Sequence, residues 1–304
     1  MLDLEQRMTE EKNPRSRGLD LMRVEEILTL MNQEDQRVPL AVAEQLPKIA
    51  AAVNRITSAI KSGGRVFYIG AGTSGRIAAQ DAAECPPTFG VSPDLFQVVM
   101  AGGPDALSHS VEWAEDSADD GYADLMSRRP TPRDVVIGIA ASGETPYVVG
   151  GLSAARVVGC GRIALVCNPG SELERLAELT ICPIVGPEVL TGSTRLKAGT
   201  AQKLVLNMIS TAVMVMLGKV YDNYMVDMVA SNNKLLARSR HIVEEACGVG
   251  PADAERLLQQ AHGNLKVALV MGKTGVDSRA AAEALAQVDG VVRKAISLLL
   301  GGSA

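Results

Sequence analysis

The chain has 304 residues and a net charge of −5, and 47% of its residues are hydrophobic but only 3% aromatic. This length suits one large domain and a smaller one, built around an aliphatic core. The acidic balance and the lack of a basic stripe argue against a nucleic-acid partner. The N-terminus carries no apolar signal, and the longest apolar stretch, 204–217, is short and contains polar residues. We therefore expect no membrane association.

The five cysteines are scattered along the chain without any paired spacing. An odd number of unpaired cysteines favours reduced thiols, so we expect a cytoplasmic protein without disulfides. The three histidines are isolated from one another, which gives no metal-ligand cluster. We therefore expect no metal site.

Residues 1–50 are predicted to form an arm followed by a helix, whose apolar period continues through Ile60. Strand-like segments then alternate with helical ones, which predicts an α/β domain at 51–234 with a parallel sheet covered on both faces. The predicted strands are 65–70, 95–103, 134–141, 162–170 and 179–186.

The segment 191–220 reads as one long helix that is apolar on most faces, so we expect it to be buried in the fold or against a partner subunit. Beyond Asn232 the sequence changes to charged, amphipathic helices with glycine breaks. We place a domain boundary near residue 235 and predict a small helical bundle at 235–304. The last four residues, 301–304, are expected to be frayed.

The first glycine-rich turn, Gly70-x-Gly72-x-x-Gly75, follows a predicted strand and has the spacing of a dinucleotide-binding turn. Such a site needs an acidic residue at the end of the second strand, but that strand ends in VVMAGG. Thr73 and Ser74 instead place hydroxyls beside the amides of a helix N-terminus, which favours a phosphate. From this motif alone, an ordinary turn, a phosphate site and a dinucleotide site all remain open.

Two further turns rich in hydroxyl groups follow along the chain, SGET at 142–145 and TGST at 191–194. In a parallel sheet such turns meet at the carboxyl edge of the strands, where ligands bind. Together they favour a sugar phosphate or a similar anion. The candidate binding residues are Gly72, Thr73, Ser74, Ser142, Gly143, Thr145, Ser193, Arg195 and Lys197. The two cations among them are explained equally well by ion pairs at the surface.

Several segments then resemble a known family: GAGTSGR (70–76), DAAECPPTFG (81–90), AEDS (114–117), IAASGETPYV (139–148) and VGPEVLTGSTRLKAGTAQKLVLNMIS (185–210). They resemble the sugar-isomerase-type (SIS) fold and, more closely, the bacterial N-acetylmuramic acid 6-phosphate etherases. The resemblance covers nearly the whole chain. It implies a flavodoxin-like α-β-α sandwich and a homodimer whose cleft involves both subunits.

The resemblance also implies a lyase that serves cell-wall sugar recycling and requires neither a metal nor an organic cofactor. The family removes D-lactate from carbon 3 of N-acetylmuramic acid 6-phosphate and leaves N-acetylglucosamine 6-phosphate. The open-chain aldehyde at C1 acidifies the proton on C2, and a base removes that proton. An acid then protonates the departing lactyl oxygen, and water adds at C3. In this reaction Arg195 and Lys197 are also candidates for holding the lactyl carboxylate.

Two glutamates are the candidate acid–base residues. Glu84 lies in AAECPPT, at the expected end of a helix, where an apolar setting would suit proton exchange near neutral pH. Glu115 is predicted to share a helical face with Glu112. An ordinary solvent-exposed helix face explains this spacing as well. The family assigns an acid–base role to the residue matching Glu84 and a supporting role to the one matching Glu115. Which carboxylate acts at C2 stays open, and one residue can serve both steps.

Two positions depart from the family pattern. Glu144 stands where the family usually carries Arg, and Trp113 stands where it usually carries Gly. If Glu144 points away from the bound anion, we expect it to pair with Arg76 or Arg195. Both departures leave the choice of substrate open.

Two other functions remain open at this point. An SIS fold also serves as a non-catalytic sensor that binds a sugar phosphate and regulates a partner, but a sensor needs no acid such as Glu84. An aldose–ketose isomerase would share the open-chain aldehyde and the proton transfer at C2.

Overall fold

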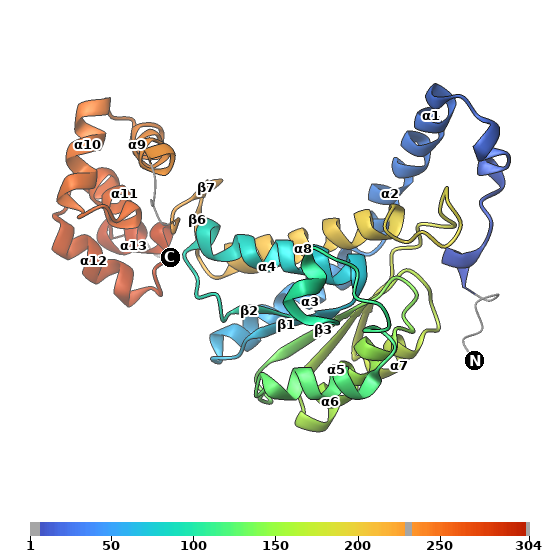
Figure 1. The fold of residues 1–304 in the computed structure, drawn as a ribbon. Coiled ribbons are helices and arrows are strands. Elements are labelled where there is room, and N and C mark those ends of the chain that lie inside the picture. The colour runs from blue at the N-terminus through green and yellow to red at the C-terminus, as the bar shows by residue number, and fades with distance from the viewer. Residues whose placement is uncertain (1–6, 229–232, 302–304) are drawn as a thin grey trace. The chain divides into compact units, whose positions relative to one another are not determined.

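The computed structural model describes residues 7–228 and 233–301 (Figure 1). The chain divides into two compact units, one made of residues 1–83 and 93–211, the other of 84–92 and 212–304. Residues 302–304 lie outside the described part, so the expected fraying of the C-terminus stays a prediction. In the part that the structure describes, every helix is too short or too polar to cross a lipid bilayer.

The first unit is built on a five-stranded sheet in which every strand is parallel to its neighbours. The strand order is β2-β1-β3-β4-β5, which is the flavodoxin-like order. All five predicted strands are confirmed: β1 (Val66–Gly70), β2 (Phe96–Met100), β3 (Val135–Ile139), β4 (Gly161–Leu165) and β5 (Leu179–Ile181). The central strands β1 and β3 are buried along their whole length, which explains their continuous apolar sequence.

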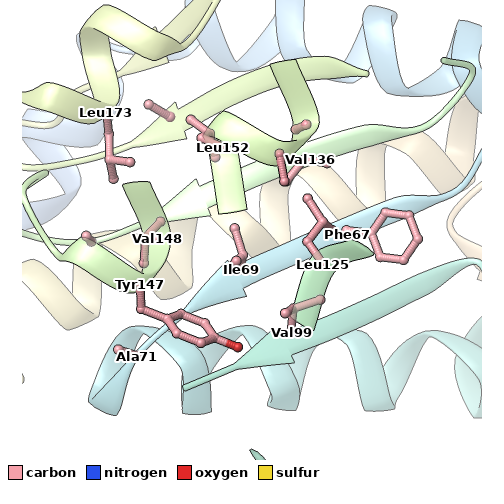
Figure 2. Packing of buried hydrophobic residues seen from close by; sticks show 14 of the residues in the cluster. Phe67, Ile69, Ala71, Val99, Leu125, Val136, Tyr147, Val148, Leu152 and Leu173 are labelled. Atoms are coloured by element: carbon pink, nitrogen blue, oxygen red, sulfur yellow. The ribbon is translucent and has the colours of Figure 1, made fainter. Parts of the chain in front are cut away.

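Helices cover both faces of the sheet, as the sequence predicts (Figure 1). One face carries α5 (Ala118–Ser127), α6 (Pro146–Val158) and α7 (Glu172–Leu176). The other carries α3 (Leu46–Lys61), α4 (Gly72–Phe89) and α8 (Lys197–Met216). Figure 2 shows the packing on the α5–α6 side, where Phe67, Ile69 and Val136 from the strands meet Leu125, Tyr147 and Leu152 from the helices.

The backbones of α5 and α6 approach each other closely because each helix has a glycine at the contact. A Cβ atom at Gly121 would lie 1.8 Å from the carbonyl oxygen of Tyr147, and one at Gly150 would lie 1.8 Å from that of Ala118. No side chain fits in either place. This contact holds the start of α5, and with it the turn that precedes Ser117, against the start of α6.

A buried polar cluster joins β1, α4 and α8. Asp81 on α4 accepts hydrogen bonds from the Tyr68 hydroxyl (2.9 Å), the Asn207 amide (2.7 Å) and the Ser210 hydroxyl (2.9 Å). Because each of these groups is satisfied inside the fold, the cluster fixes how α4 lies beside α8.

The N-terminal region contains more elements than the single predicted helix. From residue 7 on, three short 3₁₀ helices, Met8–Glu10, Pro14–Ser16 and Leu19–Leu21, precede α1 (Val24–Asp35), α2 (Arg37–Ala43) and α3. Pro39 and Pro47 each fall in the first turn of a helix. Proline has no N–H and favours such positions, so the helical period of the sequence is interrupted there.

The second unit contains the predicted C-terminal helices, α9 (Asn233–Cys247), α10 (Pro251–Gln260), α11 (Leu265–Thr274), α12 (Ser278–Gln287) and α13 (Val292–Leu299). They pack around α11, whose residues from Leu265 to Met271 are all buried. A small hairpin, β6 (Val220–Tyr221) and β7 (Tyr224–Met225), was not predicted because its strands are only two residues long. The two compact units divide inside α8, after Thr211. The domain limits at 50 and 234 stay predictions.

Candidate active site

A cavity of about 500 Å³ lies at the carboxyl edge of the sheet, within the first unit. The turns after β1 and β3 form much of its wall, as expected for a fold of this strand order. The N-terminal arm and the segment before α5 complete the wall. The lining residues are Arg7, Glu10, Ala71, Gly72, Thr73, Ser74, Glu115, Asp116, Ile139, Ala140, Ala141, Ser142, Glu144, Thr145, Pro146 and Thr194.

The turn after β1 brings the start of α4 to this cavity. A Cβ atom at Gly70 would lie only 3.0 Å from the Gly75 nitrogen, and Gly72 has a φ of 51°, so glycine suits both positions. Thr73 and Ser74, in the first turn of α4, both line the cavity. The Ser74 hydroxyl donates a hydrogen bond to Oε1 of the buried Gln202 (2.9 Å). Amides at a helix start, flanked by hydroxyls, form a site suited to an anion.

The turn after β3 contributes Ser142 and Thr145 to the cavity but not Gly143. Gly143 is buried, and a Cβ atom there would lie 2.3 Å from the Ser171 hydroxyl oxygen. Its φ of 74° is the left-handed conformation that glycine adopts most easily. Gly143 therefore shapes the turn, while Ser142 and Thr145 on either side of it line the cavity. Thr145 immediately precedes α6, which begins at Pro146.

Glu144 lies in the same turn and also lines the cavity. Its carboxylate forms an ion pair with Arg7 of the N-terminal arm and accepts a hydrogen bond from the Glu172 amide (3.0 Å). The expectation that Arg76 or Arg195 pairs with it was wrong. Arg76 donates instead to the carbonyl oxygens of Ala106 and His109, at 2.9 Å each. A partner 137 residues away cannot be recognised from local sequence.

The turn at 191–194 reaches the cavity through Thr194 alone. Ser193, Arg195 and Lys197 are absent from the lining residues of the described chain. Arg195 is exposed, whereas Lys197 is completely buried and points its ammonium group at Glu34 of α1, with an Nζ–Oε2 distance of 2.6 Å. The structure thus uses Lys197 to hold the N-terminal region against α8, a contact that the motif does not predict.

The start of α8 is already occupied by a carboxylate of the protein itself. Glu188 is buried and accepts hydrogen bonds from the Lys197 and Ala198 amides, at 3.0 Å each. Burial raises the pKa of Glu188, and these two amides act in the opposite direction. At Glu34 burial also acts to raise the pKa, but the hydrogen bond and charge of Lys197, together with Asn13 and Arg37, outweigh it and the pKa is lowered. Of the three hydroxyl-rich turns, the first two each contribute two hydroxyl side chains to the cavity lining in the described chain, and the third contributes Thr194 alone.

Glu115 lines the cavity, although the helix expected around it is absent. Residues 112–115 form a turn in which Trp113 has a φ of 62°, a left-handed conformation that no α-helix contains. The Glu115 carbonyl accepts a hydrogen bond from the Tyr147 amide (3.0 Å), which ties the turn to α6. The Glu115 side chain is exposed, and it also borders a second cavity of about 240 Å³ beside Glu112 and Trp113.

Glu84 is not among the residues that line the 500 Å³ cavity. Helix α4 continues past it to Phe89 and includes Pro86 and Pro87, so Glu84 is not at the helix end. Its side chain is exposed, while that of Cys85 beside it is buried. The apolar setting expected for Glu84 is therefore absent from the described chain.

Sequence reasoning missed four lining residues that carry polar side chains: Arg7, Glu10, Asp116 and Thr194. Thr194 and Asp116 lie next to predicted residues and could have been found by extending the motifs by one position. Arg7 and Glu10 have no local signal, because only the path of the arm brings them to the cavity.

Comparisons with known proteins agree with this architecture. Residues 48–156 match the N-terminal SIS domain of glucokinase regulatory protein, and 114–243 match the SIS domain. Residues 222–300 match the C-terminal lid domain of glucokinase regulatory protein. Among solved structures, a phosphoheptose isomerase from Francisella tularensis shares the fold, with a TM-score of 0.52 and 17% identity over 64% of this chain and 100% of that chain.

Curated relatives are far more similar and extend over nearly the whole chain. The N-acetylmuramic acid 6-phosphate etherase of Rhizobium rhizogenes is 52% identical over 97% of this chain and 96% of its own length. That of Salmonella agona is 51% identical over 95% of this chain and 97% of its own length. On this similarity, the chain belongs to the N-acetylmuramic acid 6-phosphate etherase family.

Proposed function

We propose that this protein is a carbon–oxygen lyase that cleaves the D-lactyl ether of N-acetylmuramic acid 6-phosphate. The products are N-acetylglucosamine 6-phosphate and D-lactate, in the catabolism and recycling of cell-wall amino sugars. One observation carries the proposal: the same cavity is lined by a helix start suited to an anion and by the carboxylate of Glu115. The chain is also 52% identical to an etherase over 97% of its length. Neither the sensor nor the isomerase alternative has comparable support.

The 6-phosphate is held by neutral donors. The first amides of α4 and the hydroxyls of Thr73 and Ser74 lie on one wall, and those of Ser142 and Thr145 belong to the other turn. Helix N-termini favour negative charge, and hydroxyls can turn to donate to each phosphate oxygen. The phosphate anchors the sugar while its open-chain form exposes C2 and C3 to acid–base groups.

Glu115 and Glu84 share the proton transfers in this proposal. One carboxylate removes the proton from C2, and a carboxylic acid protonates the ether oxygen as the C3–O bond breaks. Water then adds across the resulting C2–C3 double bond to give N-acetylglucosamine 6-phosphate. Both side chains are exposed in the single chain. Acid–base catalysis near neutral pH favours a desolvated carboxyl group, so both side chains need to be shielded from solvent.

In our proposal a second subunit shields these two side chains from solvent. Glu84 lies 11 residues beyond Thr73 on α4, about 16 Å along the helix axis from the phosphate-binding turn. We propose a homodimer in which each subunit supplies Glu84 to the cavity of the other. The exposed apolar side chains Met208, Val215 and Met216 on α8 provide surface for such a contact.

The reaction is tested by measuring D-lactate release from N-acetylmuramic acid 6-phosphate. The native protein should release D-lactate, and Glu84→Gln should lower the rate at least about a hundredfold, the usual scale of general acid–base help. Binding of the sugar phosphate without any release of lactate would contradict the lyase and favour a sensor. Full activity in Glu84→Gln would move the acid–base role to Glu115.

Mixing two inactive variants tests the shared site. Glu84→Gln and Glu115→Gln subunits that exchange freely form mixed dimers in which one cavity has both native carboxylates. Activity should return to about a quarter of the native value, because half of the dimers are mixed and each has one native site. If both glutamates act within one chain, mixing restores nothing.

We also propose that the protein works in the cytoplasm. Its five cysteines are free thiols, and Cys85, Cys160 and Cys167 are buried. Proteins with only reduced cysteines are typical of reducing compartments. Cell fractionation against a cytoplasmic marker enzyme tests this location.

A further inference from the structure

Arg7 is the single cation among the side chains that line the 500 Å³ cavity in the described residues. Four carboxylates line the same cavity, namely Glu10, Glu115, Asp116 and Glu144. The proposed substrate brings two anionic groups of its own, a phosphate and the lactyl carboxylate. Once the neutral donors of α4 hold one of these anions, Arg7 is the lining side chain of the described chain whose charge suits the other.

The arm that carries Arg7 is fixed to the sheet by buried hydrogen bonds. The Thr9 amide donates to Oδ1 of Asn168 (3.3 Å), and the Asn168 side-chain amide donates back to the Thr9 hydroxyl (3.0 Å). Asn168 also donates to the Ala141 carbonyl (2.9 Å), next to the turn after β3. Thr9 and Asn168 are each 1% exposed. Arg7, two residues before Thr9, is therefore held at the cavity wall.

Glu144 orients the Arg7 guanidinium but occupies only part of its N–H donors. Its Oε1 atom binds Nη2 of Arg7 and also accepts the hydrogen bond from the Glu172 amide. A guanidinium has five N–H donors, so several remain for another partner. The Arg7 side chain is 19% exposed and faces the cavity. Arg7 thus neutralises the charge of Glu144, the residue that departs from the family pattern, and Glu144 in turn positions Arg7.

On the proposed function, we infer that Arg7 binds the lactyl carboxylate of the substrate and that Glu144 is its positioning residue. The two cations that sequence reasoning offered for this carboxylate do not line the cavity, since Arg195 is exposed elsewhere and Lys197 is paired with Glu34. The planar fork of a guanidinium matches a carboxylate in two parallel hydrogen bonds. In this arrangement the phosphate binds to the amides and hydroxyls at the start of α4.

The first experiment compares Arg7→Ala with Arg17→Ala, which removes the same charge from an exposed position of the arm outside the cavity lining. Arg7→Ala should raise KM for N-acetylmuramic acid 6-phosphate about ten- to hundredfold, as for loss of a charged hydrogen bond. The inhibition constant of N-acetylglucosamine 6-phosphate, which lacks the lactyl group, should stay near the native value. An equal weakening for both compounds would place Arg7 on the phosphate and overturn the assignment. An unchanged KM would overturn it as well.

The double variant Arg7→Ala/Glu144→Gln separates binding from mere neutralisation. In Arg7→Ala the unpaired Glu144 carboxylate repels the substrate, and Glu144→Gln removes that repulsion. We expect the double variant to regain part of the lost affinity but to stay well above the native KM. Complete recovery would mean that Arg7 only neutralises Glu144, and the inference would fail. Thermal unfolding of each variant shows whether a loss reflects the site or the fold.

Failure of the proposed function is distinguishable from failure of this inference. If the native protein releases no D-lactate, the binding of N-acetylmuramic acid 6-phosphate and of N-acetylglucosamine 6-phosphate is measured by calorimetry instead. Arg7→Ala should then weaken only the compound with the lactyl carboxylate. Equal effects on the two compounds would contradict the role of Arg7 whether or not the protein is a lyase.

Discussion

The ammonium group of Lys197 lies 2.6 Å from the carboxylate of Glu34, and both side chains are completely buried. Glu34 also accepts hydrogen bonds from Arg15 (2.8 Å) and from the Asn13 amide (3.0 Å). One carboxylate on α1 therefore connects the N-terminal arm to the first residue of α8. A lysine that the motif offers as a substrate ligand instead holds together two segments that are 163 residues apart.

Replacing this lysine should destabilise the fold. In Lys197→Met, Glu34 loses its buried partner, and breaking such a pair costs about 3–5 kcal/mol of unfolding free energy. The exposed Lys203 on the same helix gives a matched control, and Lys203→Met should change stability by less than about 0.5 kcal/mol. Denaturant unfolding of both variants measures the difference, and equal stabilities would contradict a structural role for Lys197.

The same contact makes stability depend on pH on the acid side. The pKa of Glu34 is lowered from its ordinary value of 4.5, so the folded state binds this proton less readily than the unfolded state does. The resulting stabilisation is complete above about pH 4.5 and is lost as the pH falls through the lower folded value. Unfolding curves of the native protein and of Glu34→Gln should therefore differ most near neutral pH and converge in acid. A constant difference would be evidence against this linkage.

The α5–α6 contact should reject any side chain at its glycines. Gly150→Ala would place a methyl group 1.8 Å from the Ala118 carbonyl oxygen, so the helices must separate, at a cost of about 1–3 kcal/mol. Gly250→Ala is the comparison, because no atom lies within 4 Å of that Cβ position and the φ of −74° suits alanine. Thermal unfolding should show a large shift for the first variant and a small one for the second. Since the contact also supports the turn before α5, Gly150→Ala should lower the activity as well.

Two of the three candidate serines, Ser74 and Ser193, should behave differently. Ser74 lines the cavity and donates to Gln202, whereas Ser193 is absent from the lining. Ser74→Ala should raise KM for the sugar phosphate about tenfold, because one hydrogen bond to a charged group is lost. Ser193→Ala should leave KM close to the native value. Similar effects in both variants would show that the third turn takes part in binding after all.

The local pattern of the chain was sufficient to predict the strands and the first two turns of the site. The central strands β1 and β3 are buried on both faces of the sheet, and burial of that kind leaves a continuous apolar signature in the sequence. The turn at Gly72 needs a left-handed backbone, and the turn at Ser142 to Thr145 opens a helix; both requirements are local. For this reason the α/β fold and the hydroxyl groups of the cavity could be predicted.

Tertiary structure alone decided which charged residues reach the cavity. Arg7 meets Glu144 because the arm is bound to Asn168, and Lys197 turns inward because Glu34 is buried beside it. Around Glu115, a left-handed Trp113 replaces the helix that the spacing of two glutamates predicted. The energy of a charge depends on partners and burial contributed by distant segments, whereas backbone preferences are encoded in neighbouring residues. The sequence by itself therefore determined the sheet and its hydroxyl-rich turns, and only the folded chain determined the charges around them.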